Sequence, residues 1–342
     1  MDLKSLSFEE LQEEFAILGE PKFRVSQVYD WMHKKCVSDI DEMTNLSKAL
    51  REKLKEKYEF TSLRMARMQE SEIDGTRKFL FELSDGNFIE SVWMKYHHGN
   101  SVCISSQVGC RMGCKFCAST LDGLERNLLP GEMLDQIYRI SQITGERVSN
   151  IVVMGSGEPM DNYDNVLKFL KIISDERGLC ISQRNITVST CGIVPGIRKL
   201  AEEKLQITLA ISLHAPTDEK RKALMPIANS YSLAEVMDAC RFYFDKTGRR
   251  ISFEYALVKG VNDREEEVAE LTSLLKGMNC HINLIPVNPI KERDYRSTDR
   301  TNVLNFQNKL EKNGINVTIR REMGRDIDGA CGQLRRRHME EV

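Results

Sequence analysis

The stretch Cys110-Arg111-Met112-Gly113-Cys114-Lys115-Phe116-Cys117 carries three cysteines in eight residues, with the spacing C-x3-C-x2-C. The backbone between these cysteines is too short to send each sulfur into a separate packing site. We therefore expect the three thiolates to converge on one point. Cysteines grouped at such short spacings are typical of metal centres. A metal centre is the predicted occupant of this stretch.

The number of ligands narrows the kind of metal. Structural zinc takes four ligands, and iron–sulfur clusters are also held mostly by four cysteines. A fourth local ligand is missing here. A 4Fe–4S cluster held by three cysteines leaves one iron open, which the amine and carboxylate of S-adenosylmethionine (SAM) can chelate. The spacing resembles that of the radical SAM superfamily, in which the cofactors carry the radical chemistry. A zinc site completed by a distant Cys or His, and a disulfide cluster, are the open alternatives.

Composition limits the partners of the chain. With 342 residues it has room for one large domain or two, and its formal net charge of −2 gives no overall nucleic-acid signal. Any RNA contact must come from local basic patches such as Arg320-Arg321, Arg325 and Arg335-Arg336-Arg337, which solvated surface would explain equally well.

The apolar segments and the cysteines predict a cytoplasmic protein. No stretch approaches the roughly 18 apolar residues of a membrane span, and the start lacks the apolar core of a signal peptide. Ten cysteines in a reducing compartment indicate metal or catalytic groups rather than a disulfide framework. Four of them have apolar or helical surroundings and are predicted to be small core residues: Cys36, Cys180, Cys240 and Cys280.

Three regions follow one another along the chain. Residues 1–60 predict a small helical accessory domain, in which Ser7 and Glu10 form a capping box. Its basic side chains could face RNA or solvent. Residues 61–100 predict a linker with a β-hairpin, because period-two segments flank Asp85-Gly86. The hairpin is expected to extend an edge of the main sheet.

Residues 101–337 alternate apolar runs with helical patterns, which predicts an α/β fold. Six β-then-α units imply a parallel sheet curved into a partial (β/α)6 TIM-like barrel with helices outside. The predicted strands are 102–105, 151–155, 185–190, 206–213, 251–258 and 281–287, with a further strand at 316–321. The predicted helices include 132–144, 165–174, 233–244, 265–276 and 303–312.

Polar or unusual residues follow five of these strands, where barrel enzymes carry their chemistry. The first strand leads into the cysteine loop, and the second into Gly157-Glu158, which suits the amine of SAM. Two further cysteines are unusual. Cys331 lies among glycines and polar residues beyond the last strand and is expected to be exposed and reactive. The alternation of side chains along the first strand lets Cys103 point into the barrel. An ordinary buried core residue is an equal alternative.

Seven motifs occur together and in order: CISSQVGCRMGCKFCAST (103–120), GSGEPMDN (155–162), STCGIVP (189–195), AISLHAP (210–216), LMPI (224–227), NLIPVNP (283–289) and VTIRREMGRDIDGACGQL (317–334). With them the chain resembles the RlmN family of radical SAM enzymes over nearly its whole length. The resemblance implies methylation of carbon 2 of adenine in 23S rRNA, at the equivalent of adenosine 2503, and in tRNA, at adenosine 37. A 4Fe–4S cluster and two SAM molecules per turnover are implied as well.

The resemblance also implies residue roles. Cys331 matches the family's methyl carrier, which passes through S-methylcysteine. Cys103 matches the resolving thiol that forms a disulfide with Cys331, and Glu90 matches the proton acceptor. Cys110, Cys114 and Cys117 match the cluster ligands. The matched SAM contacts are Gly157, Glu158, Ser189, Ser212, Leu213, His214 and Asn288.

The implied partners are 23S rRNA, tRNA and a flavodoxin- or ferredoxin-like electron donor, and we expect a monomer without a membrane partner. Two other functions stay open from the residues alone. A Cfr-type enzyme would methylate carbon 8 of the same rRNA adenosine, and a zinc-stabilised RNA-binding protein would have no activity. A radical SAM enzyme for a non-RNA substrate is a third alternative.

Overall fold

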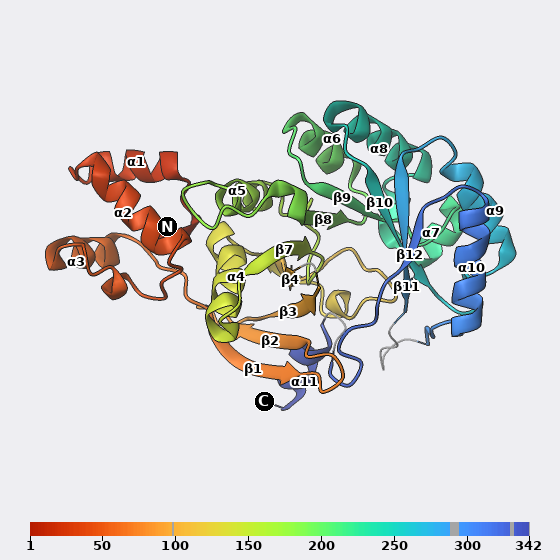
Figure 1. Ribbon diagram of the computed structural model, residues 1–342, viewed down its shortest axis with the longest axis horizontal. Helices are drawn as coiled ribbons and strands as arrows, with labels where there is room; N and C mark the ends of the chain where they lie inside the picture. Colours follow the sequence, from red (N-terminus) through yellow and green to blue (C-terminus); the bar gives the residue numbers. More distant parts are fainter. Residues whose placement is uncertain (98, 288–293, 329–331, 342) are drawn as a thin grey trace.

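The computed structural model describes residues 1–97, 99–287, 294–328 and 332–341. Its centre is one curved, ten-stranded sheet (Figure 1). In spatial order the strands are β1 (Arg64–Glu70), β2 (Arg77–Glu82), β3 (Phe88–Tyr96), β4 (Gly99–Ile104), β7 (Val148–Val153), β8 (Ile186–Thr190), β9 (Thr208–Ser212), β10 (Ile251–Leu257), β11 (Cys280–Pro286) and β12 (Val317–Ile319).

The seven strands from β4 to β12 pair in parallel, whereas β1 to β4 pair antiparallel. The predicted partial α/β barrel is therefore confirmed, as is the hairpin of β2 and β3 on its edge. β1 was not predicted, because Arg64–Glu70 is mostly polar and exposed along its length and shows no apolar alternation. Such a charged strand is typical of a sheet edge. A separate ribbon pairs β5 (Gln107–Gly109) with β6 (Leu124–Asn127).

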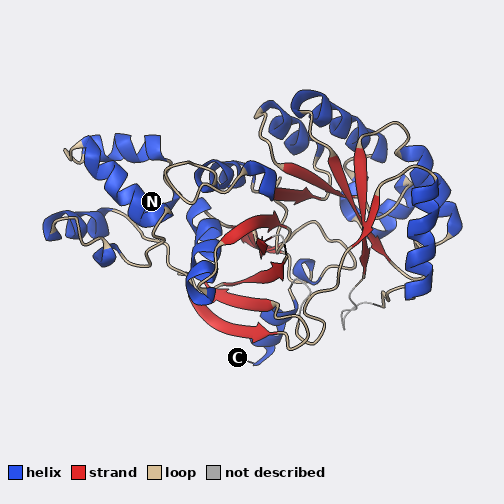
Figure 2. Cartoon of the chain, in the orientation of Figure 1, coloured by secondary structure: helices blue, strands red, loops and turns tan. Residues whose placement is uncertain are grey.

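Helices cover the outer face of the parallel strands (Figure 2). They are α4 (Pro130–Thr144), α5 (Tyr163–Ile173), α6 (Val194–Glu202), α7 (Asp218–Leu224), α8 (Leu233–Thr247), α9 (Glu265–Leu274) and α10 (Arg300–Lys312), and α11 (Gln333–Glu341) follows the barrel. α8 shows how local sequence sets its bounds. Ser232 and Glu235 form a capping box at its start, and Gly248, with φ of 65°, ends it. Single 3-10 turns occupy Leu3–Ser5, Ile40–Glu42, Ala118–Thr120, Gln183–Asn185 and Pro226–Asn229.

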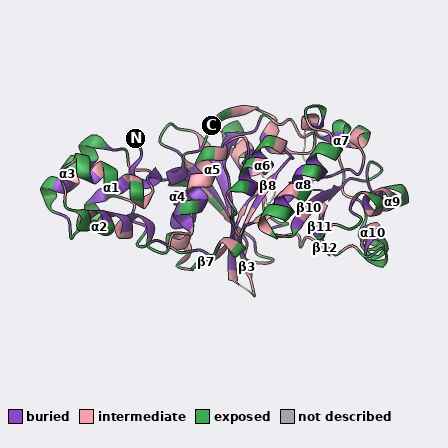
Figure 3. Ribbon diagram, turned by 90° about the horizontal axis from the view of Figure 1, so that it is seen from above, coloured by how far each residue is buried: buried purple, intermediate pink, exposed green. Residues whose placement is uncertain are grey.

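The N-terminal residues form a second, smaller core beside the barrel (Figures 1 and 3). It is built from α1 (Phe8–Ile17), α2 (Lys22–His33) and α3 (Lys48–Lys57), and the predicted Ser7–Glu10 capping box begins α1. Two buried contacts attach this core to α4. Lys4 Nζ lies 2.6 Å from Asp135 Oδ1, and His33 Nδ1 lies 2.8 Å from the Tyr138 hydroxyl.

The main core fills the space between the sheet and its helices (Figure 3). Cys36, Cys240 and Cys280 are buried, as predicted, but Cys180 is exposed and that prediction is wrong. Cys180 lies in the loop between α5 and β8, outside the packed layers, so its apolar sequence neighbours did not imply burial of its side chain. Within the described residues, no helix is long and apolar enough to cross a bilayer.

Candidate active site

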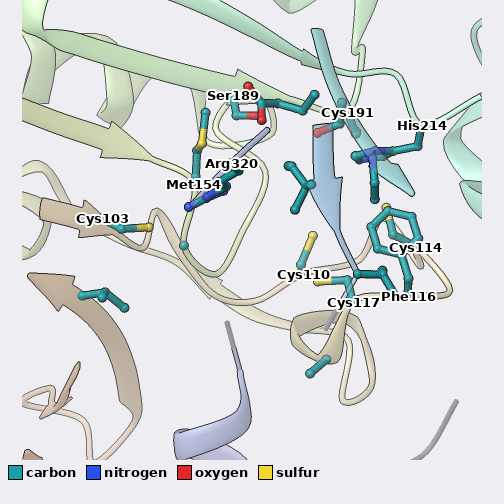
Figure 4. A pocket seen from close by; sticks show the side chains of 18 of the residues that line it. Cys103, Cys110, Cys114, Phe116, Cys117, Met154, Ser189, Cys191, His214 and Arg320 are labelled. Atoms are coloured by element: carbon teal, nitrogen blue, oxygen red, sulfur yellow. Dashed lines mark hydrogen bonds between the residues drawn. The ribbon is translucent and has the colours of Figure 1, made fainter. Parts of the chain in front are cut away.

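A cavity of about 500 Å³ opens at the carboxyl ends of the parallel strands. Cys103 on β4 and the loop cysteines Cys110, Cys114 and Cys117 all line it. Figure 4 shows the three loop cysteines bordering the cavity and Cys103 on a neighbouring strand. The predicted residues Gly157, Glu158, Ser189, Ser212 and His214 line the same cavity. Residues from six separate strands and loops are thus brought together where the sequence pattern predicted.

Backbone hydrogen bonds hold the cysteine loop in place. Cys110 N–H donates to the Gly123 carbonyl at 2.7 Å, and Lys115 N–H donates to the Leu224 carbonyl at 2.9 Å. The Thr120 hydroxyl donates to the carbonyl oxygens of Cys114 and Cys117. Gly109 is required at the start of the loop. Its φ is 75°, and a Cβ there would lie 2.1 Å from the Gly123 carbonyl oxygen.

The three thiols face one cavity rather than one point. Among the described side chains, no three His, Cys, Asp or Glu groups are arranged to hold a single ion. A 4Fe–4S cluster has no such requirement, because each thiolate binds a different iron atom. Burial raises the pKa of Cys110 to about 12 and also raises that of Cys114. Coordinated iron reverses this effect by stabilising the thiolate. Three thiols around one cavity therefore fit three corners of the cluster.

Gly157 and Glu158 join the ends of β7 and β8 to the β4–β5 connection. At Gly157 φ is 110°, and a Cβ would lie 2.7 Å from atoms of Ser106 and Gln107. The buried Glu158 carboxylate accepts from Met160 N–H at 3.0 Å and from Cys191 N–H at 2.7 Å. Burial raises its pKa. A carboxylate has about four acceptor positions, so Glu158 retains capacity for a ligand ammonium on its cavity side.

His214 is fixed as a neutral hydrogen-bond donor. Its Nδ1 accepts from Ala256 N–H at 2.9 Å, so the ring proton lies on Nε2. Burial lowers its pKa to about 3. The residue has φ of 56°, and Asn262 holds its carbonyl at 2.7 Å. This left-handed backbone is costly for a non-glycine residue and is typical of functional sites.

The other predicted contacts differ in position. Ser189 on β8 and Ser212 on β9 end their strands at the cavity. Leu213 is fully buried beside them and is not among the residues that line the cavity. Asn288 and Cys331 lie outside the described residues.

Glu90 on β3 does not line the cavity but lies at its border. It is buried, and its Oε2 is 3.0 Å from the Lys78 ammonium. Its two oxygens accept from Gly332 N–H at 2.5 Å and from Arg335 N–H at 2.6 Å. The predicted proton acceptor thus contacts the residue that follows Cys331 directly. Gly332 also packs on the cysteine loop, because a Cβ there would lie 3.0 Å from Ser119 N.

Further residues of the cavity were missed as site residues, among them Glu254 and Arg320. Glu254 on β10 is buried at the cavity wall, where burial raises its pKa and Asn283 donates to its Oε2 at 2.8 Å. A charged residue inside the apolar strand ISFEYAL was the available signal. Arg320 also lines the cavity (Figure 4), whereas the sequence assigned it to a surface patch.

Comparison with known proteins agrees with this geometry. Residues 104–272 match the family model for the radical SAM superfamily, and residues 1–60 match that for the N-terminal domain of the ribosomal RNA large subunit methyltransferase RlmN. The crystal structure of a radical SAM methyltransferase from Sphaerobacter thermophilus is 42% identical, covers 97% of this chain and 98% of that chain, and superposes with a TM-score of 0.93. These matches, on a chain with a curved parallel sheet and a three-cysteine loop, show a SAM-dependent methyltransferase of the radical SAM superfamily, with a 4Fe–4S cluster and SAM as cofactors.

Curated relatives show which family of the radical SAM superfamily the chain belongs to. A protein of Lachnospira eligens named "Probable dual-specificity RNA methyltransferase RlmN" is 70% identical over 100% of this chain and 97% of its own length. A protein of the same name from Lachnoclostridium phytofermentans is 63% identical over 100% of this chain and 96% of its own length. The chain belongs to the RlmN family.

Proposed function

We propose that this enzyme methylates carbon 2 of adenine in 23S rRNA and in tRNA, at the positions equivalent to adenosine 2503 and adenosine 37. One observation supports this more than any other. Cys103 and the three cluster cysteines share a cavity, and the residue that follows Cys331 packs on the cluster loop. An ordinary radical SAM enzyme needs only the cluster cysteines there, whereas two additional thiols suit a methyl transfer through sulfur.

The chemistry of the substrate explains why two thiols are needed. Carbon 2 of adenine is electron-poor and carries a strong C–H bond, so it cannot attack the methyl group of SAM directly. The cluster and SAM, when bound, supply a radical that removes hydrogen from a methyl group. We assign Cys331 to carry that methyl group, which its thiolate takes from a first SAM by displacement. A second SAM is used with the cluster in the same turnover.

Release of the methylated base requires two further groups of the chain. After the methyl carbon has bonded to carbon 2, the Cys331 sulfur ties protein to RNA. Glu90 is proposed to accept the proton that carbon 2 loses. Besides this proton the adduct must lose one electron, which the cluster would accept. The thiolate of Cys103 then attacks the Cys331 sulfur and a disulfide forms. The electron pair of the broken bond stays with the methylene carbon, which takes up a proton to complete the methyl group. A cellular reductant must reopen that disulfide before the next turnover.

SAM is proposed to bind along the strand ends. The Glu158 carboxylate would accept from the methionine ammonium, and the close approach permitted by Gly157 brings the backbone to the ligand. The neutral His214 would donate from Nε2, because its Nδ1 is already bonded to the backbone. The remaining proposed contacts are Ser189, Ser212, Leu213 and Asn288.

Residues 1–60 are proposed to contact the RNA, residues 61–100 to form the linker with its hairpin, and residues 101–337 to form the catalytic barrel. Phe23 on α2 is 57% exposed, and the Lys35 ammonium lies 3.6 Å from the centre of the Trp31 ring. Aromatic rings beside cations are typical of surfaces that stack on single-stranded bases. The proposal includes a flavodoxin- or ferredoxin-like electron donor and a monomeric, cytoplasmic enzyme.

The direct test is an anaerobic assay of the reconstituted enzyme with SAM and protein-free large-subunit rRNA or tRNA. Mass analysis of the digested RNA maps the new methyl group, and 2-methyladenosine is the expected product. An 8-methyl product would instead assign the enzyme to Cfr-type chemistry. Two results together would refute the proposal that RNA is the substrate. The brown, cluster-containing protein would leave the RNA unmodified, and it would show no salt-dependent RNA binding.

A further inference from the structure

The residues that flank 329–331 are anchored on the hairpin of β1 and β2. The Asp326 carboxylate accepts from the Ser71 hydroxyl at 2.5 Å and from Glu72 N–H at 2.8 Å. Asp328 and Gln69 exchange two hydrogen bonds, at 3.0 and 3.1 Å. Residues 326–328 are therefore fixed by a strand pair that precedes the barrel in sequence.

Lys78 connects both sides of this segment. Its side chain is fully buried, and its Nζ donates to the Asp328 carbonyl at 2.5 Å and pairs with Glu90 Oε2 at 3.0 Å. Asp328 precedes residues 329–331, and Glu90 binds the backbone that follows them. A buried ammonium is costly unless it is paired and hydrogen-bonded, so its presence between these groups indicates a defined task.

Glu90 completes the connection by capping α11. Its two oxygens accept from Gly332 N–H and Arg335 N–H, which lie just before and in the first turn of that helix. A carboxylate at a helix N-terminus satisfies free backbone donors and interacts favourably with the helix dipole. The Lys78 ammonium pairs with the same carboxylate and so fixes the position of the oxygens that cap the helix.

Strand register places the anchor beside Cys103. Cys103 on β4 pairs with Val92 on β3, and Val92 pairs with Lys78 on β2. Residues opposite each other on neighbouring strands point to the same face, so these three form a row. Glu90 lies two residues before Val92 on that face. It is a diagonal neighbour of Cys103, at about 7–8 Å between Cα atoms.

We propose that Lys78 is a positioning residue, which acts through Glu90 and the Asp328 carbonyl to fix the residues on both sides of 329–331 at the sheet, next to the strand that carries Cys103. The inference rests on the proposed function, since it concerns the two thiols assigned there. It predicts that the Lys78 ammonium raises the effective concentration of the Cys331 thiol at the Cys103 thiol. This effect requires no RNA, SAM or turnover. A 1 Å displacement of reacting groups can change a rate by about a hundredfold.

The test is the rate at which diamide oxidises Cys103 and Cys331 to a disulfide in the reconstituted, cluster-containing enzyme. Diamide takes up the two electrons and two protons that the thiols lose. Peptide mapping first verifies a free thiol at Cys331 and then measures the disulfide over time. Lys78→Met is expected to slow disulfide formation about tenfold or more, with cluster content unchanged. A rate equal to that of the unmodified sequence would overturn the proposal.

Two further variants separate positioning from general damage. Arg64→Gln removes an exposed ion pair with Glu82 on the same hairpin and should leave the rate unchanged. Glu90→Gln should slow the reaction. Lys78→Met combined with Glu90→Gln should slow it by less than the product of the two single effects, because the two side chains share one ion pair. Additive effects would contradict a shared route.

If Lys78→Met fails to fold, hydrogen exchange in Glu90→Gln tests the proposal instead. In Glu90→Gln, the amides of the 332–341 peptide should exchange faster than in the unmodified enzyme, and unchanged exchange would overturn the proposal. A separate experiment tests the methyl-carrier role. Methylation by the Cys331→Ala enzyme would refute that role, but it would not change the disulfide rates or the hydrogen exchange of the Lys78 and Glu90 variants.

Discussion

Two buried lysine–carboxylate pairs attach the two ends of the chain to the barrel region. Lys4 lies 2.6 Å from Asp135 and connects the N-terminal helices to α4. Lys78 lies 3.0 Å from Glu90 and connects the C-terminal segment to the sheet. The Asp135 carboxylate also accepts from Leu63 N–H at 2.7 Å, as Glu90 accepts from Gly332 and Arg335. Both pairs therefore combine an ion pair with backbone donors.

The two pairs differ in whether a residue of the cavity lies next to them. Neither Lys4 nor Asp135 lines the cavity, and both belong to packed contacts between helical layers. Glu90 is a diagonal neighbour of Cys103, which does line it. The same chemistry thus serves the attachment of a domain at one end and the placement of a reactive segment at the other. Breaking the first pair should cost stability, whereas changes near the second should cost chemistry.

The largest expected effect is at the C-terminal end. Cys331→Ala should reduce RNA methylation to background, because the methyl carrier is lost, while the iron and sulfide content is unchanged. Mass spectrometry of the RNA measures the product. Cys180→Ala is the matched control, since this thiol is exposed and is not among the residues that line the cavity. Methylation by the Cys331→Ala enzyme would refute the methyl-carrier role, and with it the proposed difference in function between the two ends of the chain.

Cys103→Ala should stop the reaction one stage later. Without the resolving thiol, the bond between Cys331 and the base persists, so RNA should remain covalently attached to the protein. Denaturing gels after nuclease digestion detect this species as a retarded band. Cys180→Ala should give none. Free, unmodified RNA as the only outcome would count against the resolving role.

Asp135→Asn tests the N-terminal pair. It leaves the Lys4 ammonium buried without its counterion, which should destabilise the protein by about 3–5 kcal/mol. Thermal unfolding measures the loss, and methylation per intact cluster below the transition should be unchanged. The control is Glu146→Gln, which removes an exposed pair with Lys95 and should leave the melting temperature close to that of the unmodified protein. Equal melting temperatures for the two variants would refute the structural role of the N-terminal pair.

The smallest effect concerns pH at the same interface. Burial lowers the pKa of His33 from 6.5 to about 3, so the folded protein keeps it neutral while the unfolded chain takes up a proton. Its contribution to stability is fully present above pH 6.5 and is lost as the pH falls toward 3. Between pH 7 and 5.5 the loss should be about 1.3 kcal/mol. Unfolding curves of His33→Gln should show a correspondingly weaker pH dependence, and an unchanged slope would contradict this assignment.

Local patterns predicted the barrel well, because each strand and helix carries its own signal. The apolar run 251–258 corresponds to β10, and the predicted helix 233–244 corresponds to α8. The three loop cysteines could be singled out for the same reason, since eight consecutive residues contain them, and all three line the cavity. Strand ends at the cavity followed from the general geometry of parallel sheets.

Features that depend on register or on distant contacts were not predicted. Lys78 looked like an ordinary polar residue of a hairpin, and its role depends on pairing with Glu90 and on Asp328, 250 residues away. Glu158 was expected to offer its carboxylate to a ligand, but both of its oxygens also bind backbone amides. Such contacts depend on which elements meet in three dimensions, and no local pattern encodes that.

The hairpin that receives the C-terminal segment lies near the start of the chain, and the segment itself is made last. During synthesis, residues 69–90 leave the ribosome long before Gly332 does. A polypeptide cut short before residue 329 keeps the three loop cysteines, Cys103 and the whole receiving surface, but it lacks Cys331, the proposed methyl carrier. Truncated products of translation or proteolysis would therefore bind the cofactors and remain unable to modify RNA.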